Sequence, residues 1–377
     1  MGITIDAKAS DTQAGIATIG GRDVFRRDVR KADGRMLYLY GYSPHTETLQ
    51  DQTSDEVAKG GELRHHPLRG EWNIYAPHRQ NRTFKPSAAD DPLAPTRPDG
   101  AATEIPFTDF ELAVFENKFT SLHVEAPEPS VIPGVETAQA YGHCDVVVYT
   151  PERKGSLATV SQATRELLVA SWCDRYESLF AKGCAYVLPF ESRGDEVGVT
   201  LSHPHGQIYG FPFVPNVQAK AGEMFAGGYS LADDLERHRE PYRVAEAGGV
   251  VAWCPPYARY PFECWVLPER AVAGPWDMTA EEREGFAYLL GEVTRRYDSY
   301  FGRDTAYTLS LQAAPNPKTP QPWHFWAQFY PLLRAPTPDG KGRVKYLASV
   351  EQHTSVFTVD VMPEFAAQTL RDHGTPP

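Results

Sequence analysis

The segment ASWCDRYESLFAKGCAYVLPFESRG, residues 170–194, returns in altered form as GEVTRRYDSYFGRDTAYTLSLQAAP, residues 291–315. Arg175 of the first copy has its counterpart in Arg296, 121 positions later (296 minus 175). A repeat of this length exceeds the roughly 20–50 residues of a solenoid unit, so it indicates the duplication of a whole α/β half. The same spacing relates Tyr176 to Tyr297, Phe180 to Phe301, Tyr186 to Tyr307 and Leu188 to Leu309.

The likeness extends to both sides of this segment. Downstream, HPHGQIY at residues 203–209 matches HFWAQFY at residues 324–330 at the same spacing. Upstream, TPER at residues 150–153 matches LPER at residues 267–270 at a spacing of 117 (267 minus 150), which implies a four-residue change in length between them. Each half is therefore predicted to run strand, P-E-R turn, amphipathic helix, strand, loop, strand.

Each half contains one clear amphipathic helix. Residues 164–180 place apolar side chains near 3.6-residue spacing, and Ser161 stands before them as a helix cap. In the second half Thr279 caps residues 280–301, whose first turn is acidic, as the helix dipole favours. Strands grouped around single helices predict an α+β fold of two duplicated halves, each an antiparallel sheet covered by helices, and not a doubly wound α/β fold.

Length and composition restrict what the chain can be. At 377 residues it can hold two domains or one duplicated domain. Its net charge of −12 argues against non-specific nucleic-acid binding, and no apolar run approaches the roughly 20 residues of a membrane helix. We expect a cytoplasmic protein with no nucleic-acid or membrane partner. The cysteines form no C-x-x-C pair and predict neither a disulfide framework nor a cysteine zinc site: Cys144, Cys173, Cys184, Cys254 and Cys264.

Domain boundaries follow from the composition and the repeat. Residues 1–60 are predicted to form an N-terminal arm, and residues 61–215 the first half, which carries the histidine-rich strand. Residues 216–245 are predicted to be a helical connector, residues 246–350 the second half and residues 351–377 a C-terminal tail.

The segment LSHPHGQIYGF, residues 201–211, carries the side chains with the most chemistry. Side chains alternate along a strand, so His203, His205, Gln207 and Tyr209 project to one face. Pro204 cannot donate a hydrogen bond to a sheet, which places it at an edge or at a strand start. The polar row is therefore predicted to line a cleft and not a core.

His205 is the predicted catalytic residue of this row. A neutral imidazole is a competent nucleophile toward phosphorus, and its other nitrogen would be held by a backbone carbonyl. Gln207 is predicted to donate its amide hydrogens to a phosphate, an interaction of roughly 3–4 kcal/mol when it is aimed at developing charge. Solvated histidines and metal ligands are the alternatives. The second copy keeps His324 but has Trp326 in place of His205, a difference that a structural role does not obviously require.

The strand H-P-H-G-Q-I resembles the active-site strand of the galactose-1-phosphate uridylyltransferase family, within the histidine-triad superfamily. The likeness covers roughly residues 60–350 and implies two histidine-triad-like halves. It implies that UDP-glucose uridylylates His205 and releases glucose 1-phosphate, after which galactose 1-phosphate attacks to give UDP-galactose. Hydrolases of the superfamily carry a third histidine where this chain has Gln207, which favours a transferase. The family also implies a homodimer.

The resemblance implies further substrate contacts in the first half. PLRGEWNIYAPHRQNR, residues 67–82, is similar to a family segment whose arginines contact the nucleotide phosphates, although without that motif a solvated pair would be the better interpretation. VFENKF, residues 114–119, is similar to the uridine-binding strand of the family. The implied contacts are Arg79 and Arg82 for the phosphates, and Asn117, Lys118 and Phe119 for base and ribose.

Two more segments match the family near the phosphate and the sugar. FESRGDEVGVTLSHPH, residues 190–205, implies that Gly198 and Thr200 surround the phosphate, although a glycine there is also explained as a turn residue. KYLASVE, residues 345–351, implies that Lys345 and Glu351 contact the hexose across a dimer interface. Considered as isolated charges, these two side chains would more often be solvated.

The chain departs from the family at both of the family's metal sites. The C-x-x-C of many members appears as DPLA, residues 91–94, and Arg153 stands in place of a histidine. Neither Ala94 nor Arg153 can bind zinc, and His203 with Asp91 does not complete a tetrahedral site. We therefore predict no zinc, iron or other cofactor, with hydrogen bonds and packing in their place. The second metal site has Ala221, Gln312, Trp326 and Gln328 in place of a glutamate and three histidines.

Three functions stay open on the sequence. The leading one is a nucleotidyltransferase that uses UDP-sugar and sugar 1-phosphate by a ping-pong route through uridylyl-His205. A nucleoside-diphosphosugar or dinucleoside-polyphosphate phosphorylase would share the covalent step but use inorganic phosphate as acceptor. A non-catalytic nucleotide-sugar binding protein is the third, and the intact His205 and Gln207 weigh against it. The sequence does not identify the sugar 1-phosphate that is accepted.

Overall fold

The computed structural model describes residues 11–49, 57–81, 86–87, 90–97, 100–316 and 321–374. The chain divides into two compact units, and it crosses between them several times. Unit 1 comprises Met1–Gly155, Ala170–Val187 and Leu201–Asn216. Unit 2 comprises Ser156–Val169, Leu188–Thr200 and Val217–Pro377.

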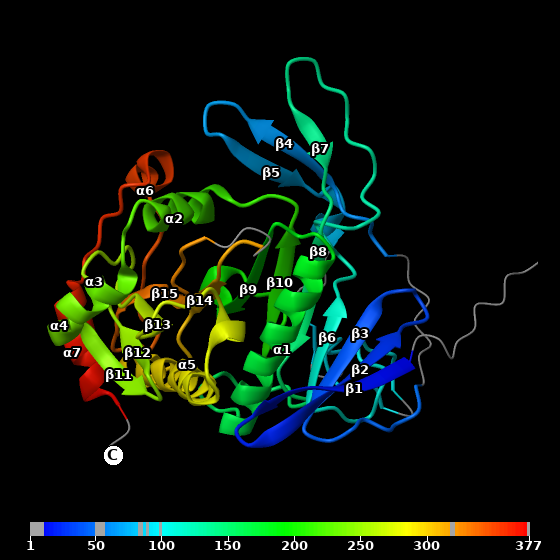
Figure 1. The fold of residues 1–377 in the computed structure, drawn as a ribbon, viewed down its shortest axis with the longest axis horizontal. Coiled ribbons are helices and arrows are strands. Elements are labelled where there is room, and N and C mark those ends of the chain that lie inside the picture. Colours follow the sequence, from blue (N-terminus) through cyan, green and yellow to red (C-terminus); the bar gives the residue numbers. More distant parts are fainter. Residues whose placement is uncertain are drawn as a thin grey trace, which may run out of the picture. The chain divides into compact units, whose positions relative to one another are not determined.

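Unit 1 is built on antiparallel strands. They are β1 (Asp11–Ile19), β2 (Arg22–Arg30), β3 (Met36–Gly41), β6 (Leu112–Glu116), β8 (His143–Val148) and β10 (His205–Phe211). Their order in the sheet is β1-β2-β3-β6-β8-β10 (Figure 1). β3 pairs with β6, which joins the N-terminal strands to the sheet directly. β1, β2 and β3 therefore extend the sheet of unit 1 on the side away from β10.

Apolar side chains cover the middle of this sheet. Leu39 of β3, Phe115 of β6 and Val148 of β8 belong to one buried cluster. The irregular segment before β6 adds Leu93 and Phe107 to the same cluster. That segment has few strand hydrogen bonds, but it is tied down because its apolar residues are buried against the sheet. A smaller antiparallel sheet has the order β5-β4-β7: β4 (Glu62–His66), β5 (Glu71–Tyr75) and β7 (Thr137–Gln139).

Helix α1 (Gln162–Ala181) begins where the sequence predicts it to begin. The Ser161 hydroxyl accepts the backbone N–H of Thr164 at 3.0 Å, which satisfies one of the unpaired donors of the first turn. Within unit 1, the fully buried Arg175 of this helix donates to Asp145 of β8 at 3.0 Å. The Asp145 side chain therefore marks the face of the sheet that α1 covers.

Unit 2 contains a second set of antiparallel strands. They are β9 (Tyr186–Arg193), which enters from unit 1, β11 (Arg243–Ala247), β12 (Val250–Trp253), β13 (Cys264–Pro268), β14 (Tyr307–Gln312) and β15 (Trp326–Pro331). Their order is β9-β14-β15-β13-β12-β11. A short pair, β16 (Leu333–Ala335) and β17 (Arg343–Val344), follows β15.

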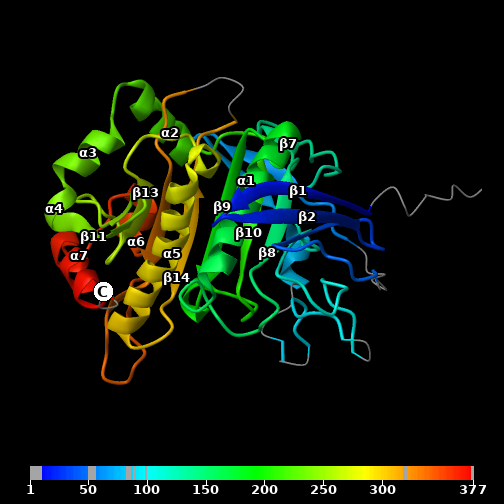
Figure 2. The same ribbon diagram turned by 60° about the horizontal axis from the view of Figure 1, so that its bottom comes forward.

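The long helix of unit 2 is α5 (Ala280–Phe301). Thr279 forms the predicted cap, and its N–H is held in return by the Glu282 carboxylate at 2.7 Å. The helix packs on β11, β12 and β13 and runs along one face of their sheet (Figure 2). The other helices are α2 (Asn216–Ala226), α3 (Leu231–Arg237), α4 (Arg239–Tyr242), α6 (Ser349–Thr354) and α7 (Pro363–Asp372). In the described part of the chain, no helix combines the length and apolar character that crossing a membrane requires.

The two halves repeat one arrangement of elements. The first runs β8, α1, β9, β10 and the second β13, α5, β14, β15, as the duplication predicts. The histidine two residues before each last strand, His203 before β10 and His324 before β15, is held in the same way. His203 Nε2 lies 2.8 Å from the Thr150 carbonyl oxygen, and His324 Nε2 lies 2.8 Å from that of Pro268. Antiparallel sheets covered by helices confirm the predicted α+β class.

Candidate active site

The polar row of β10 lies on the more open face of the strand. His205, Gln207 and Tyr209 are partly exposed, whereas Gly206 and Ile208 between them are buried. Pro204 stands directly before the strand, and its carbonyl accepts the N–H of Tyr149 at 3.2 Å. The alternation and the position of the proline agree with the prediction from sequence.

The ring of His205 is fixed by one backbone group. Its Nδ1 lies 2.7 Å from the carbonyl oxygen of His203, which can only accept a hydrogen bond. Nδ1 therefore carries the proton, and the lone pair of the neutral ring is on Nε2. Burial lowers the pKa of His205, which favours this neutral form. The arrangement presents an unprotonated nitrogen, the form that a nucleophile toward phosphorus requires.

The ring of His203 is held at both nitrogens. Nδ1 lies 2.9 Å from an Asp91 carboxylate oxygen, and Nε2 lies 2.8 Å from the Thr150 carbonyl oxygen. Both partners are acceptors, so both hydrogen bonds form together only when each ring nitrogen carries a proton. The geometry therefore fixes the ring between the Asp91 carboxylate and the Thr150 carbonyl, with the backbone carbonyl of His203 presented to His205.

Asp91 connects this histidine to an arginine. Arg153 Nε lies 3.5 Å from the same carboxylate oxygen that faces His203, and the other oxygen accepts the N–H of Leu93 at 3.1 Å. Burial by itself would raise the pKa of Asp91. The hydrogen bonds from His203 and Leu93 and the charges of His203 and Arg153 outweigh it, so the pKa is lowered and the carboxylate stays ionised.

The side chains at the positions of the family's zinc site do not suit zinc. Asp91 is already paired with His203 and with the Arg153 guanidinium, and a guanidinium is not a metal ligand. Across the described ranges, no three His, Cys, Asp or Glu side chains are grouped so that they could hold a metal ion. The Asp91, His203 and Arg153 cluster is a hydrogen-bonded ion-pair network in its own right.

The positions of the family's second metal site are engaged in packing and amide hydrogen bonds. Gln328 donates to Glu263 at 2.9 Å, and Gln312 accepts from Gln218 at 2.8 Å. Trp326 stacks on Trp265 with ring centroids 5.3 Å apart. The position of unit 2 that corresponds to His205 is therefore occupied by Trp326, which is part of an aromatic cluster.

The predicted base and ribose contacts are brought together in unit 1. Arg79 donates to the carbonyl of Phe119 at 2.6 Å, and the Asn117 side chain accepts the N–H of Phe119 at 2.8 Å. The Lys118 ammonium lies 5.7 Å from the centre of the Phe119 ring. Arg82 lies outside the described residues.

Tyr209 connects this segment to the histidine strand; the alternation places it on this face, but no role was predicted for it. Ser121 donates to its phenolic oxygen at 3.3 Å. It lies one strand step beyond Gln207 on the face of His205, so the same alternation that identified Gln207 could have pointed to a role for Tyr209. Alternation gives no sign of Asp91, which lies 112 positions before His203 in an irregular segment; only the family resemblance set the two side by side, at the positions of the zinc site.

The remaining predicted contacts belong to unit 2. Gly198 has a φ of 74° and ends a short 3-10 helix, so the turn explanation holds for it, and Thr200 is half-buried. Lys345 and Glu351 are not solvated: they form a buried pair at 2.8 Å, and Lys345 also donates to the Thr358 carbonyl. The hydrogen bond from Lys345 lowers the pKa of Glu351 to about 2.

Most of the chain is similar to known proteins. Residues 50–215 match the family model described as galactose-1-phosphate uridyl transferase, N-terminal domain, and residues 217–371 match the C-terminal domain. Galactose-1-phosphate uridylyltransferase of Thermotoga maritima is 34% identical over 325 residues, which cover 82% of this chain and 98% of that protein. The Streptomyces lividans enzyme of the same name is 31% identical over 373 residues, covering 92% and 97%. A solved structure titled "Structure of uridylyltransferase" has a TM-score of 0.72 at 26% identity and covers 83% of this chain and 98% of that one.

Proposed function

The chain belongs to the galactose-1-phosphate uridylyltransferase family, and from this we propose that it transfers a uridylyl group from UDP-glucose to galactose 1-phosphate. The observation that carries the proposal is the 2.7 Å contact between His205 Nδ1 and the His203 carbonyl. This contact leaves the other ring nitrogen as a lone pair on the open face of β10.

In the first step, Nε2 of His205 attacks the α-phosphorus of UDP-glucose. A phosphorus–nitrogen bond forms, the phosphorus–oxygen bond to the β-phosphate breaks, and its electron pair leaves with glucose 1-phosphate. The ring becomes positive, and the His203 carbonyl stabilises that charge through the proton on Nδ1. Gln207, one strand step away, donates its amide to the phosphoryl oxygens.

In the second step, a phosphate oxygen of galactose 1-phosphate attacks the phosphorus of uridylyl-His205. The phosphorus–nitrogen bond breaks, its electron pair returns to Nε2, and UDP-galactose leaves. Splitting one displacement into two lets a single nucleophile serve both substrates. The ring ends as it began, neutral and held at Nδ1.

Asp91 and Thr150 position this nucleophile indirectly. By holding both nitrogens of His203, they fix the backbone from which the His203 carbonyl points at His205. Burial lowers the pKa of His205, which keeps its ring neutral for the attack. The proposal assigns no step to a resident metal ion.

The substrate contacts carried over from the family complete the proposal. Arg79, Asn117, Lys118 and Phe119 are proposed to hold the nucleotide, with Arg82 at its phosphates. Gly198 and Thr200 are proposed for the phosphate, and Lys345 and Glu351 for the hexose in a homodimer. Size-exclusion chromatography with light scattering tests the dimer.

Covalent labelling tests the mechanism directly. Protein mixed with UDP-glucose that carries ³²P at the α-phosphate should retain label, and excess glucose 1-phosphate should remove it. His205→Gly should abolish both labelling and exchange. His373→Gly, at the end of α7, is the matched control and should label normally. Full exchange activity in His205→Gly would sink the mechanism.

An acceptor screen separates transfer from phosphorolysis. Uridylylated protein is offered galactose 1-phosphate, other sugar 1-phosphates and inorganic phosphate, one at a time. Release of label as UDP-galactose supports the proposal. Release as UDP with inorganic phosphate alone would instead identify a phosphorylase. Absence of any covalent label would leave a binding protein as the better description.

A further inference from the structure

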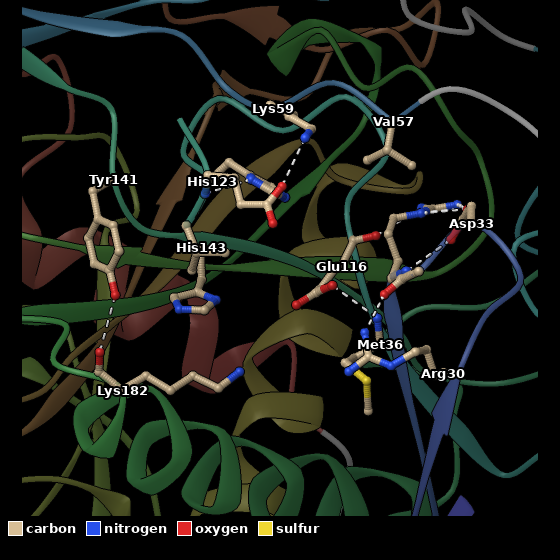
Figure 3. A pocket seen from close by; sticks show the side chains of 14 residues that line it. Arg30, Asp33, Met36, Val57, Lys59, Glu116, His123, Tyr141, His143 and Lys182 are labelled. Carbon is tan, nitrogen blue, oxygen red and sulfur yellow. Dashed lines mark hydrogen bonds and ion pairs between the residues drawn. The ribbon is translucent and has the colours of Figure 1, made fainter. Parts of the chain in front are cut away.

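A polar cavity of about 640 Å³ lies within unit 1. The turn between β2 and β3, the end of β6, the start of β8 and the residue after α1 all contribute side chains to it (Figure 3). His143, His123, Lys182, Arg30 and Glu116 carry its chemistry.

This cavity is separate from the face that carries His205. His205 pairs with Val148 at one end of β8, and His143 stands at the other end, roughly 17 Å away at strand spacing. The two also differ in face. Asp145, on the same face as His143, contacts α1, whereas Val148 shares the face of His205.

His143 is the residue of the cavity that indicates a bound ligand. It is only 6% exposed, yet its Nε2 has no hydrogen-bond partner among the described residues. A buried polar atom without a partner is costly, so a native structure normally supplies one. Burial lowers the pKa of His143 to about 4, so the ring is neutral at neutral pH. Figure 3 shows the ring on the cavity wall above the Lys182 side chain.

His123 offers a second donor to the cavity. Its Nδ1 accepts the backbone N–H of Glu125 at 3.0 Å, which places the ring proton on Nε2. Burial lowers the pKa of His123 as well, so this ring is also neutral. The Nε2–H of His123 takes part in no described hydrogen bond. The cavity therefore offers this donor together with the unpartnered Nε2 of His143.

The charges of the cavity leave cations available. Asp33 is paired with Arg35 at 2.6 Å and Glu125 with Lys59 at 3.0 Å, so two of its three carboxylates are neutralised. No ion pair is described for Lys182, and Arg30 donates only to a backbone carbonyl. Two cations thus face one remaining carboxylate, Glu116, which uses one oxygen for the N–H of Met36.

We propose that this cavity binds a phosphate monoester, with Lys182, His143 and His123 on the phosphoryl group and Glu116 on a hydroxyl group of the ester. A tetrahedral oxyanion accepts hydrogen bonds from several directions at once. It therefore suits donors that come from different elements of the cavity wall. The free oxygen of Glu116 would repel a bare anion but accepts a hydroxyl. A metal ion is not the occupant, because the described His, Cys, Asp and Glu side chains include no group of three that could hold one.

Imidazole resonances of protein labelled with ¹⁵N-histidine distinguish the two sites in one experiment. Inorganic phosphate and glucose 1-phosphate are titrated separately, and His143→Gln and His123→Gln identify the two cavity signals. Both signals should shift saturably, and the ester should bind more tightly than inorganic phosphate. Lys182→Gln should weaken binding about tenfold or more, the loss expected for one charge-assisted hydrogen bond.

Lys341→Gln, at an exposed lysine of unit 2, is the matched control and should leave binding unchanged. Shifts confined to His203 and His205 would place the ligand at the β10 face and overturn the proposal. So would titrations that move no cavity signal, or unchanged affinity in Lys182→Gln. Binding of inorganic phosphate at least as tight as that of the ester would overturn the role of Glu116.

Discussion

At the scale of the residue, Asp91 positions His205 indirectly. It holds the ring of His203, and the His203 carbonyl holds the ring of His205. Asp91→Asn keeps the shape of the side chain but removes the charge that faces the His203 ring. We expect kcat to fall about tenfold or more, because small displacements of a nucleophile are costly, while KM for UDP-glucose changes less. Steady-state kinetics and the rate of covalent labelling measure the effect.

The neighbouring residue provides the control for Asp91. Asp90 is exposed and accepts only a hydrogen bond from Ser87, so Asp90→Asn should leave both rates within about twofold. Asp91→Glu, which restores the charge, should recover part of the loss. Equal kinetics for Asp91→Asn and Asp90→Asn would show that the contact with His203 does not position the nucleophile.

His143 gives a second prediction at this scale, for stability against pH. Its pKa is about 4 in the folded chain and 6.5 when exposed, so the unfolded chain binds the proton more readily. The neutral ring's contribution is present above pH 6.5 and is lost as the pH falls toward 4. We expect a loss of about 2 kcal/mol between pH 7 and pH 5.

Urea unfolding at the two pH values measures this loss. In His143→Gln the loss between pH 7 and pH 5 should shrink, because the substituted side chain does not titrate. His65→Gln is the control, at a histidine of β4 whose pairing with Glu136 is looser, at 3.6 Å. If His143→Gln loses as much stability on acidification as the parent protein, another group is responsible.

Sequence patterns reveal some of these residues and not others. His205 and Gln207 are visible because strand alternation and the duplicate strand both point to them. The hydrogen bonds that hold His203 are not visible in any local pattern, since Asp91 lies in an irregular segment, where only the family resemblance pointed to it, and Thr150 acts through its backbone carbonyl. Hydrogen bonds between segments far apart in the chain leave no local periodicity.

At the scale of the element, the cap of α5 is worth measuring. Thr279→Ala removes the hydroxyl that accepts the N–H of Glu282 and opens the capping box. We expect the free energy of unfolding to fall by about 1 kcal/mol. Ser299→Ala, at an exposed serine near the other end of the same helix, should be neutral. Thermal or urea unfolding compares the two, and equal stabilities would contradict the role of the cap.

The strand that duplicates β10 permits a test of why unit 2 lacks a nucleophile. Trp326→His recreates the histidine of the first copy, but it removes a ring stacked on Trp265 and Trp323. We expect a stability loss of about 2–4 kcal/mol from the cavity. Uridylyl label should stay at one per chain and disappear when His205→Gly is added. Label on the chain with both Trp326→His and His205→Gly would show that a histidine at this position of β15 is enough to give unit 2 a nucleophile.

The elements themselves were largely predictable. Both long helices and their caps follow from 3.6-residue spacing, and the last strand of each half follows from period-two alternation. The short strand β7 and the 3-10 turn before Gly198 were not predicted, because a few residues carry too little periodicity. The aromatic cluster around Trp326 is formed by segments far apart in sequence, which alternation does not relate.

At the scale of the whole molecule, the predicted absence of a resident metal is the property to test. Metal analysis of purified protein should find neither zinc nor iron in stoichiometric amount, and dialysis against a chelator should leave exchange activity unchanged. The reason is the donor set, in which Asp91 faces Arg153 and glutamines hold the second group of positions. Stoichiometric metal, or activity lost to the chelator and restored by zinc, would contradict it.

The duplication made the two-half architecture predictable from sequence alone. The path of the chain between the two units was not predictable. Residues 156–169 and 188–200 belong to unit 2 although they flank parts of unit 1. Likewise, β1, β2 and β3 join the sheet of unit 1 through pairing with β6, and residues 1–60 carry no repeat that would indicate it.

The aromatic interior of unit 2 has a photophysical consequence. Of the seven tryptophans, Trp72 and Trp172 belong to unit 1 and the other five to unit 2. Trp265, Trp323 and Trp326 lie close enough to exchange excitation energy, with neighbouring centroids 5.3 and 6.1 Å apart. Intrinsic fluorescence should therefore report mainly on unit 2, while chemical labelling of His205 reports on unit 1. The unmodified chain thus carries an optical probe for one unit and a covalent probe for the other.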